Sequence, residues 1–356
     1  MLDSPPSDLQ ILPATAGDYR QVKSLSTGIY KGLDYLPVKF YHWLEESQRK
    51  MFVAKSNGKV VGFNSYLLVD GGITALLQAF RVAPWMRNCG IGGALLRFSY
   101  SSLRSKHPSV TRARATVTEY FPPSLITKYH LLHSKAVVSV VLPNNQLKDT
   151  IKLLGDRVKF VGERGQPAVL NTREVHGFIE KNPDTINGLF PKKLLLQGWV
   201  PFTIQKPNVD SLLSSNLLWL YSEPCEEKYE FIEICGTIKP IVNDTPIPAP
   251  LSNLDTVSQC SPPFPGFLSV ANPVLPVPSA DDTYFLNIDL FGTDPTLAKA
   301  HVLHQLSEAA QGLPSEGKTI CFVIAEESLR IELTRFCEGL TPFYLHESQR
   351  VIELVL

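Results

Sequence analysis

The stretch RVAPWMRNCGIGGALLRF, residues 81–98, constrains the fold of this chain more than any other. An apolar run ends at Pro84, and an arginine and three glycines then stand directly before a helical pattern. The first turn of a helix leaves about four backbone N–H groups without partners, and the helix dipole adds positive charge there. Glycines allow those N–H groups to approach a phosphate closely, and Arg87 adds a full positive charge. We therefore interpret the segment as a strand–loop–helix unit that holds a pyrophosphate.

Bulk composition is that of a globular protein. The 356 residues include 34 basic and 34 acidic side chains and are 44% hydrophobic, so we expect two domains with real cores and no nucleic-acid or anionic-membrane partner. The N-terminus has no signal-peptide pattern, and no apolar run reaches the ~20 residues of a membrane helix. The six cysteines form no CxxC pair and the histidines show no metal-ligand spacing. These patterns predict free thiols, no metal and a cytoplasmic location.

The region around the glycine loop has the pattern of a mixed α/β domain. Two apolar strands flank Asn57-Gly58, the strongest short signal of a β-hairpin. A third strand, GGITALLQAFRVAP, leads into the loop, and a helix is expected from about Gly92 to Ser105. Beyond it, VTRARATVTEY predicts a strand, PPSLITKYHLLHS a short helix with a proline entry, and AVVSVVL another strand.

The end of the chain repeats this order of elements. DTYFLNIDLFG, KTICFVIAE and TPFYLHESQRVIELVL predict strands, with helical patterns TDPTLAKAHVLHQLSEAAQG and SLRIELTRFCEG between them. The position equivalent to the glycine loop reads Phe291-Gly292-Thr293-Asp294-Pro295, which has neither the arginine nor the glycine series. We interpret the pattern as a degenerate internal duplication.

A proline-rich stretch precedes this second copy. Residues 240–278 contain ten prolines, including TPIPAP, SPPFP and PVLPVP. Proline removes a backbone donor and is excluded from helix and sheet interiors. We therefore expect an extended loop of polyproline character inside or beside the second domain.

The glycine loop does not match the two commonest phosphate-binding motifs. A Walker loop ends in Gly-Lys-Ser/Thr, whereas this one continues Gly92-Gly93-Ala94, and the third glycine of the Rossmann GxGxxG spacing is missing. What remains is R-x-x-G-x-G after a strand ending in Val-Ala-Pro, in a sheet that begins with a hairpin. This arrangement resembles motif A of the GNAT acetyltransferase superfamily, which binds acetyl-CoA between two splayed strands of a mixed sheet.

Further segments resemble a family within this superfamily, the vertebrate histidine N-acetyltransferases, which acetylate the α-amino group of free histidine. These segments are GIYKGLDYLPVKFYHWL, LLVDGGITALLQAFRVAPW, LITKYHLL, LLLQGWVPF and YFLNIDLFG. The resemblance implies a diverged or paralogous member with an α/β (mixed α+β) GNAT fold and a second, degenerate GNAT-like domain. The implied boundaries are a catalytic domain over 1–142, a connecting segment over 143–170, and a C-terminal domain over 171–356.

The resemblance also assigns the residues that bind acetyl-CoA. The strand edge before the loop would pair with the pantetheine arm, and the loop and first helical turn would hold the pyrophosphate. The strand-edge residues are Phe80, Arg81 and Val82, and the loop residues are Arg87, Asn88, Cys89, Gly90, Ile91, Gly92 and Gly93. Cys89 occupies a backbone-contact position in this motif, so we do not interpret it as a nucleophile.

Transfer of an acetyl group from a thioester to an amine needs a neutral amine, a polarised carbonyl and a proton for the thiolate. By resemblance, Tyr129 is the candidate acid. Glu119, at a strand end, is the remaining carboxylate nearby and the candidate base, directly or through a water molecule. Gln78 stands where the family has a glutamate, and it can orient a water molecule but cannot act as a base. His133, placed one helical turn from Tyr129 by the expected helix, is the weaker alternative base.

The first two helices and their connection cover the acceptor site in the GNAT fold. Tyr30, Asp34, Tyr35 and Trp43 can form an aromatic box with one acid for an ammonium or imidazole group, although aromatic core packing would use the same residues. Three interpretations follow: an acetyltransferase for a small amine, first of all an amino acid such as histidine; a peptide or protein N-acetyltransferase; or an acetyl-CoA-binding scaffold without catalysis.

Overall fold

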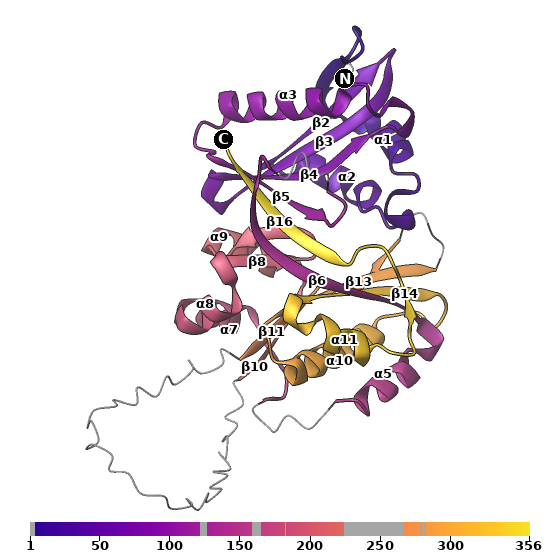
Figure 1. Ribbon diagram of the computed structural model, residues 1–356, viewed down its shortest axis with the longest axis vertical. Coiled ribbons are helices and arrows are strands. Elements are labelled where there is room, and N and C mark those ends of the chain that lie inside the picture. The colour runs from indigo at the N-terminus through magenta and orange to yellow at the C-terminus, as the bar shows by residue number, and fades with distance from the viewer. Residues whose placement is uncertain are drawn as a thin grey trace, which may run out of the picture.

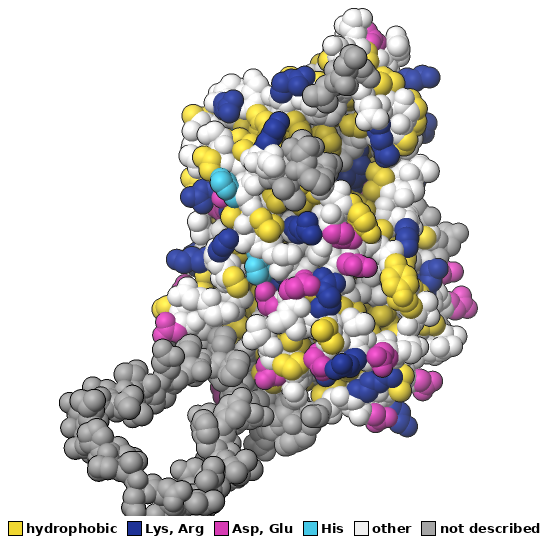
Figure 2. All heavy atoms as spheres, viewed as in Figure 1, with side chains coloured by type: hydrophobic (Ala, Val, Ile, Leu, Met, Phe, Trp, Pro, Cys, Tyr) yellow, Lys and Arg dark blue, Asp and Glu magenta, His cyan; other side chains and the backbone are white. Residues whose placement is uncertain are grey.

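The structure is a computed structural model that describes residues 4–121, 127–158, 165–181, 183–223, 266–277, 280 and 282–356. Within these residues, most strands join one mixed sheet of 14 strands, and β8 and β9 form a separate two-stranded sheet. Basic and acidic side chains are mixed over the face shown in Figure 2, in keeping with a formal net charge of zero.

The first half of the chain forms the upper part of Figure 1. Its elements are β1 (Gln10–Pro13), α1 (Tyr19–Leu25), α2 (Leu36–Glu45), β2 (Arg49–Ser56), β3 (Lys59–Val69), β4 (Thr74–Val82), α3 (Ile91–Lys106) and β5 (Arg112–Thr118). The predicted hairpin connects β2 and β3, and Asn57 and Gly58 have the positive φ values, 49° and 71°, that its tight turn requires.

The second half contains a larger set of elements. They are β6 (His130–Pro143), α5 (Leu147–Gly155), β7 (Ala168–Val169), α7 (Thr172–Lys181), α8 (Pro183–Leu189), β8 (Leu194–Gln197), β9 (Val200–Thr203), α9 (Lys206–Leu213), β10 (Leu218–Ser222), β11 (Phe267–Ala271), β12 (Leu275–Pro276), β13 (Thr283–Phe291), α10 (Pro295–Gln311), β14 (Lys318–Glu326), α11 (Arg330–Phe336), β15 (Thr341–Pro342) and β16 (Ser348–Val355). The order β13, α10, β14, α11 repeats the β4, α3, β5 pattern of the first half.

One strand, β16, joins the sheets of the two halves. β16, at the C-terminal end of the chain, lies between β5 of the first half and β6, and it is antiparallel to both (Figure 1). The other edge of β6 pairs with β14 over nine positions. The sheet therefore runs without a break from the first half into the second.

Helices cover both faces of the first half of the sheet. On one face, Phe40 of α2 packs against Phe63 of β3, with ring centroids 6.2 Å apart. On the other, the side-chain amide of Asn64 donates a hydrogen bond of 2.9 Å to Ser99 of α3. Successive strand residues point to opposite faces, so α2 and α3 lie on opposite sides of the sheet.

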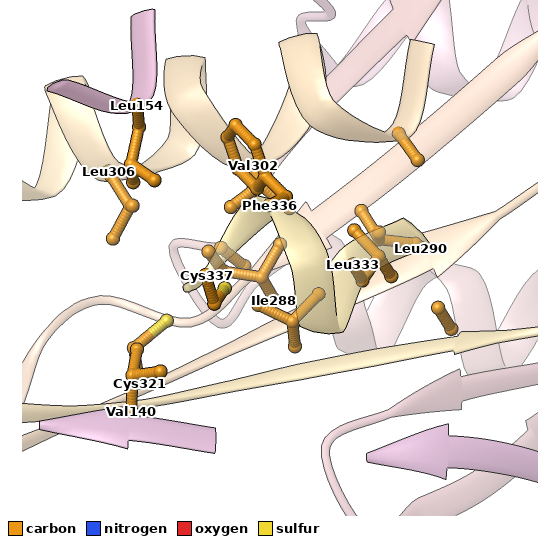
Figure 3. Packing of buried hydrophobic residues seen from close by; sticks show 14 of the residues in the cluster. Val140, Leu154, Ile288, Leu290, Val302, Leu306, Cys321, Leu333, Phe336 and Cys337 are labelled. Carbon is orange, nitrogen blue, oxygen red and sulfur yellow. The ribbon is translucent and has the colours of Figure 1, made fainter. Parts of the chain in front are cut away.

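The second half has its own core. Apolar side chains from α5, α10 and α11 meet those of β6, β13 and β14, as the labelled cluster in Figure 3 shows. Cys321 and Cys337 are buried in this cluster as free thiols, and burial raises the pKa of both, that of Cys337 to about 11. Cys89 is also free, while Cys225, Cys235 and Cys260 lie outside the described residues. Within the described part of the chain, no helix is long and apolar enough to cross a membrane.

The helix predicted over PPSLITKYHLLHS is wrong where the structure describes it. Residues 122–126 lie outside the described part, Tyr129 precedes a strand, and β6 already begins at His130. His133 therefore lies on a strand and is not the helical neighbour of Tyr129. The cause is tertiary, because β16 pairs with β6 from His130 to Ala136 and so extends the strand through residues whose local pattern favours a helix.

The expectation that residues 240–278 contain no sheet interior is wrong at their C-terminal end. β11 is buried over all five residues and pairs with both β10 and β13. Its sequence, FLSVA, contains no proline, so every residue can donate to the sheet. Residues 240–265 and 278 lie outside the described part of the chain.

Candidate active site

An opening between β4 and β5 lies at the centre of the first half. The two strands are parallel, but their ladder covers only Thr74–Leu76 with Arg112–Arg114. β4 continues to Val82 and β5 to Thr118, each held on its far edge by another strand. This is the splayed sheet that the sequence resemblance implies. The equivalent strands of the second half, β13 and β14, pair over seven positions and leave no such opening in the described residues.

A β-bulge in β4 determines which side chains lie on each face beside the opening. Ala79 and Phe80 together oppose the single residue Asn64 of β3. Ala79 adopts φ 54°, a left-handed value that is rare for a non-glycine residue and typical of functional sites. Because the bulge adds one residue, Gln78 and Arg81 share the face covered by α2, whereas strict alternation would place them on opposite faces.

The glycine loop joins β4 to the start of α3. Arg87 and Asn88 are exposed, and Asn88 and Gly90 adopt left-handed φ values of 64° and 69°. α3 begins at Ile91, and no side chain caps its N-terminus. The first N–H groups of this 16-residue helix therefore have no side-chain acceptor, and the loop before them carries the exposed Arg87, a combination that suits an anion.

Packing explains two further positions of this loop. A Cβ atom at Gly92 would lie 3.1 Å from the Phe80 ring, so the glycine lets α3 approach β4 closely. Gly93 is exposed, and a Cβ there would meet only the flexible end of Arg97. The Cys89 thiol contacts the backbone oxygen of Arg87 at 3.5 Å, in keeping with a structural role within the loop.

The corresponding helix of the second half, α10, has an N-terminus that is capped by a side chain. Only residues 292–294 separate β13 from α10. The Asp294 carboxylate accepts hydrogen bonds from the backbone N–H groups of Thr296 and Leu297 at 2.7 and 2.9 Å. These donors are thereby satisfied within the protein, and the carboxylate repels an anion.

The predicted aromatic residues cluster on the face of the sheet that α2 covers. The rings of Tyr30 and Tyr35 stack with centroids 6.4 Å apart, and Tyr35 lies 5.8 Å from Trp43. The Tyr35 hydroxyl accepts a 3.1 Å hydrogen bond from the backbone N–H of Ala79 in the bulge. Burial raises the pKa of Tyr35 to about 12, although the charge of Arg81 lowers it, so its hydroxyl stays protonated.

Gln78 is held in one orientation by this cluster. Its side-chain oxygen accepts a 2.7 Å hydrogen bond from Arg49. The Arg49 guanidinium stacks on Trp43 at 3.8 Å from the ring centroid and pairs with Glu46 at 2.6 Å. The amide oxygen of Gln78 is therefore occupied, and its NH₂ group is directed away from Arg49.

The acid of the predicted aromatic box is already paired. Asp34 accepts hydrogen bonds from the guanidinium of Arg81 at 2.9 and 3.3 Å and from the backbone N–H of Leu36 at 3.1 Å. Both partners are buried, with 4% and 7% of their surfaces exposed. The charge of Asp34 is thus neutralised by Arg81, and the side chain of Arg81 points away from the phosphate loop, onto the face covered by α2.

The predicted base, Glu119, connects the two halves. Its carboxylate accepts hydrogen bonds of 3.1 Å from the backbone N–H groups of Glu347 and Ser348, just before and at the start of β16. Burial raises the pKa of Glu119, but these hydrogen bonds and one from its own backbone outweigh burial, so the pKa lies below its ordinary value. A carboxylate in this state is a weak proton acceptor.

The predicted acid, Tyr129, lies against α3. Its hydroxyl is 3.1 Å from that of Tyr100, and its ring meets Phe121 edge-on. A surface cavity of about 440 Å³ adjoins Tyr100 and is flanked by Arg97 and Arg104. Tyr129 and the glycine loop are therefore on the α3 side of the sheet, whereas Gln78 and the aromatic cluster are on the α2 side.

Two residues of this region come from the second half and were missed by sequence reasoning. His346 precedes β16 and meets Tyr30 edge-on, with centroids 5.8 Å apart. Trp199, in the turn between β8 and β9, lies 5.3 Å from His346. The only signal in the sequence was the segment LLLQGWVPF, which contains Trp199 and resembles the family; nothing local marked His346.

Comparisons with known proteins agree with this geometry. Residues 19–124 match the family described as "Acetyltransferase (GNAT) family", and residues 163–244 and 251–326 match "Histidine N-acetyltransferase, C-terminal". Histidine N-acetyltransferase of Oreochromis niloticus is 28% identical over 336 residues, which cover 93% of this chain and 88% of the relative. That of Xenopus tropicalis is 27% identical over 351 residues, which cover 96% of this chain and 95% of the relative.

A solved structure shows the same overall architecture. A tandem GNAT protein from the clavulanic acid biosynthesis pathway aligns over 98% of both chains with a TM-score of 0.53 and 14% identity. The expected mixed α/β fold with a second, degenerate GNAT-like unit is confirmed by this similarity and by the repeated strand and helix order. The family matches and the relatives identify an N-acetyltransferase: residues 19–124 match the GNAT acetyltransferase family, and the chain as a whole resembles the histidine N-acetyltransferases.

Proposed function

We propose that the chain transfers the acetyl group of acetyl-CoA to the α-amino group of a free amino acid, with histidine as the first candidate. The observation that carries this proposal is the separation of β4 from β5 directly beside the uncapped N-terminus of α3. The free edge of Phe80–Val82 would pair with the pantetheine arm, and Arg87 with residues 88–93 would hold the pyrophosphate. Backbone N–H groups near Val82 would polarise the thioester carbonyl.

The acceptor would bind on the opposite face. The rings of Tyr30 and Tyr35, which stack, would form one wall of its site. The guanidinium groups of Arg81 and Arg49 already lie over the two tyrosine rings and over Trp43, so these rings would shape the site without enclosing a cation. Asp34 contributes by fixing Arg81 behind these rings, because its own charge is already paired. His346 of the second half contacts Tyr30, and Trp199 packs on His346; this cover favours a small acceptor over a peptide.

The reaction would need no covalent enzyme intermediate. With the thioester on the α3 side and the amine on the α2 side, the two would meet in the opening between β4 and β5, and proximity would supply much of the rate. Tyr129, whose hydroxyl is hydrogen-bonded to that of Tyr100, would protonate the departing thiolate. The orientation of Gln78 by Arg49 suits a residue that positions the acceptor or a water molecule.

A thiol-release assay with acetyl-CoA tests this proposal. The acceptor panel should contain the free amino acids, small polyamines and peptides with free N-termini. Release with histidine or another free amino acid is the expected result, and mass spectrometry of the product would locate the acetyl group on the α-nitrogen. Release with peptides alone would contradict the free amino acid as acceptor. Binding of acetyl-CoA without release would support a scaffold.

One added negative charge in the glycine loop tests whether this loop binds the pyrophosphate of acetyl-CoA. Gly93 is the third residue of α3, so Gly93→Glu places a carboxylate where the helix dipole stabilises it and where it would repel a pyrophosphate. We expect an unchanged or slightly higher Tm and a loss of acetyl-CoA binding of at least about 100-fold, measured by calorimetry. The matched control, Gly93→Gln, has the same size without the charge and should bind within about tenfold of the parent. Equal binding by both variants would place the pyrophosphate elsewhere.

A further inference from the structure

His346 closes the acceptor side of the opening between β4 and β5. On the β4 side, Tyr35 accepts a hydrogen bond from Ala79, and Tyr30 stacks on Tyr35. On the β5 side, the segment that carries His346 is attached to the end of the strand, because Glu119 accepts hydrogen bonds from the next two backbone N–H groups. The contact between His346 and Tyr30 therefore bridges the two sides of the opening.

The His346 imidazole has an unused nitrogen. Its Nδ1 atom is buried and has no hydrogen-bond partner in the described part of the chain. Burial lowers the pKa of His346, and the Glu119 carboxylate raises it by less, so the ring is neutral at pH 7. A neutral imidazole has one nitrogen that accepts a proton.

The groups around His346 leave this nitrogen as the available base. The charged side chains on the packed segments have partners. Glu119 accepts from the backbone N–H of Glu347, and Lys31 donates to the backbone oxygen of Tyr344. Arg81, which lies over the Tyr30 ring, is paired with Asp34. Tyr30 and Trp199 contribute rings, and neither is a base at pH 7. The adjacent Glu347 is exposed, and its backbone N–H is the donor to Glu119.

Further buried polar atoms near this place also lack partners. Thr116 of β5 and Gln349 of β16 lie on the same face of the sheet, since Gln349 pairs with Thr118. The Oγ1 atom of Thr116 and the Oε1 atom of Gln349 are both buried without a hydrogen-bond partner in the described residues. The Gln349 amide holds Gly198, the residue before Trp199, by donating to its backbone oxygen at 2.5 Å. Unpaired buried acceptors are costly, and they are expected where a polar ligand binds.

We propose that His346, supplied by the second half of the chain, is the general base of the acetyl transfer. The proposal rests on the proposed function. The acceptor's ammonium group would give one proton to the free nitrogen of His346, and the resulting amine would attack the thioester carbon. The new N–C bond forms, and the C–S bond breaks with its electron pair going to sulfur. Tyr129 protonates the thiolate, and the second proton lost by the amine restores the Tyr129 hydroxyl. His346 then releases its proton to solvent.

This assignment explains two features of the site. The position where the family has a glutamate is Gln78, which cannot take a proton, and Glu119 has its oxygens occupied by backbone donors. The assignment also gives the second half of the chain a role in catalysis. The N-terminus of α10 in that half is capped by Asp294 and does not offer its N–H groups to a cofactor. The active site is then complete only when both halves are present.

The test compares His346→Gln and His346→Ala with the parent chain in the thiol-release assay. We expect kcat to fall by about 100-fold or more in both variants, while acetyl-CoA affinity stays within about threefold. Imidazole added to the buffer should restore activity to His346→Ala, which has space for it, in proportion to the neutral imidazole fraction. His346→Gln, whose side chain fills that space, should not respond. His304→Gln, on α10, is the control and should retain full activity.

Three outcomes would overturn the proposal. Activity of His346→Gln within about threefold of the parent would exclude His346 as the base. A large loss that imidazole does not restore, with an unchanged pH profile, would show a structural role. If the parent chain binds acetyl-CoA but transfers nothing to any amine, the proposed function itself fails. That failure would be seen with the parent chain alone, so it can be distinguished from the two outcomes that depend on the His346 variants.

Discussion

At the scale of single residues, Asp289 is a buried carboxyl that makes stability depend on pH. One oxygen accepts a 2.6 Å hydrogen bond from the backbone N–H of Gly198, and the other has no partner in the described residues. Burial raises the pKa of Asp289 to about 7, although Lys135 and the Gly198 N–H lower it. Between about pH 4 and pH 7 the folded chain therefore keeps a proton that the unfolded chain has lost. The contribution of this group to the free energy of unfolding falls as the pH rises, by up to about 1.4 kcal/mol per pH unit.

We therefore expect Asp289→Asn to gain stability relative to the parent as the pH rises from 4.5 to 7. An asparagine keeps an acceptor for Gly198 and cannot ionise. Urea unfolding of both proteins at several pH values measures the difference in free energy. Asp184→Asn, at an exposed position of α8, is the control. Parallel pH curves for the parent and Asp289→Asn would show that Asp289 ionises normally in the folded state.

At the scale of elements, the two equivalent helices α3 and α10 differ in how they begin. Asp294 caps α10 through two backbone N–H groups, whereas α3 begins at a glycine loop without a side-chain cap. We expect Asp294→Ala to lower the free energy of unfolding by about 1 kcal/mol, the usual value of an N-cap. The variant should still bind one acetyl-CoA per chain, because β13 and β14 remain paired over seven positions.

Urea unfolding measures the stability of this variant, and calorimetry measures its binding stoichiometry. Glu308→Ala, on the same helix and partly exposed, should change the free energy of unfolding by less than about 0.5 kcal/mol. A second acetyl-CoA bound by Asp294→Ala would mean that the cap alone keeps the cofactor out of the second half.

At the scale of the whole molecule, β16 makes the two halves fold as one unit. It pairs with β5 along one edge and with β6 along the other, so neither half has its complete sheet without it. Each half contains a buried tryptophan that can report its unfolding: Trp43 lies in the core of the first half, and Trp219 lies in the second half. We expect variants that retain only one of these tryptophans to unfold with coincident urea transitions. Two separate transitions would show that the halves are independent domains.

Proline in β16 should destabilise both halves together. Val351 is fully buried and has partners on both sides, so Val351→Pro removes a donor from a central strand. We expect this variant to lower the urea midpoint reported by Trp43 and the midpoint reported by Trp219 by the same amount. Val355→Pro, at the exposed end of the same strand, is the matched control and should have a small effect. A loss confined to one probe would contradict the coupling.

The pattern of neighbouring residues was sufficient to predict the hairpin, the glycine loop and most helices of the described chain. Each depends on neighbouring residues: Asn57-Gly58 adopts a turn that few other pairs allow, and Gly90 permits the left-handed φ before α3. The clustering of Tyr30, Tyr35 and Trp43 could be predicted in the same way, because they lie within 14 residues of each other in the sequence. The domain boundary expected after residue 142 stays a prediction, and β6, which ends at Pro143, pairs with both β14 and β16.

The sequence by itself determined the class of fold and the position of the glycine loop, because glycine torsions, hydrophobic periodicity and the family resemblance are properties of contiguous residues. Only the tertiary structure decided the partners of the charged and titratable groups. Asp34 is neutralised by Arg81 because a bulge in β4 turns Arg81 toward it, and no local pattern marks that bulge. His346 lies more than 300 residues from Tyr30 along the chain, and it meets that ring because β16 returns to the first half of the sheet. Contacts made by sheet pairing over such separations have no signature in any short segment, so they become visible only when the strands are placed.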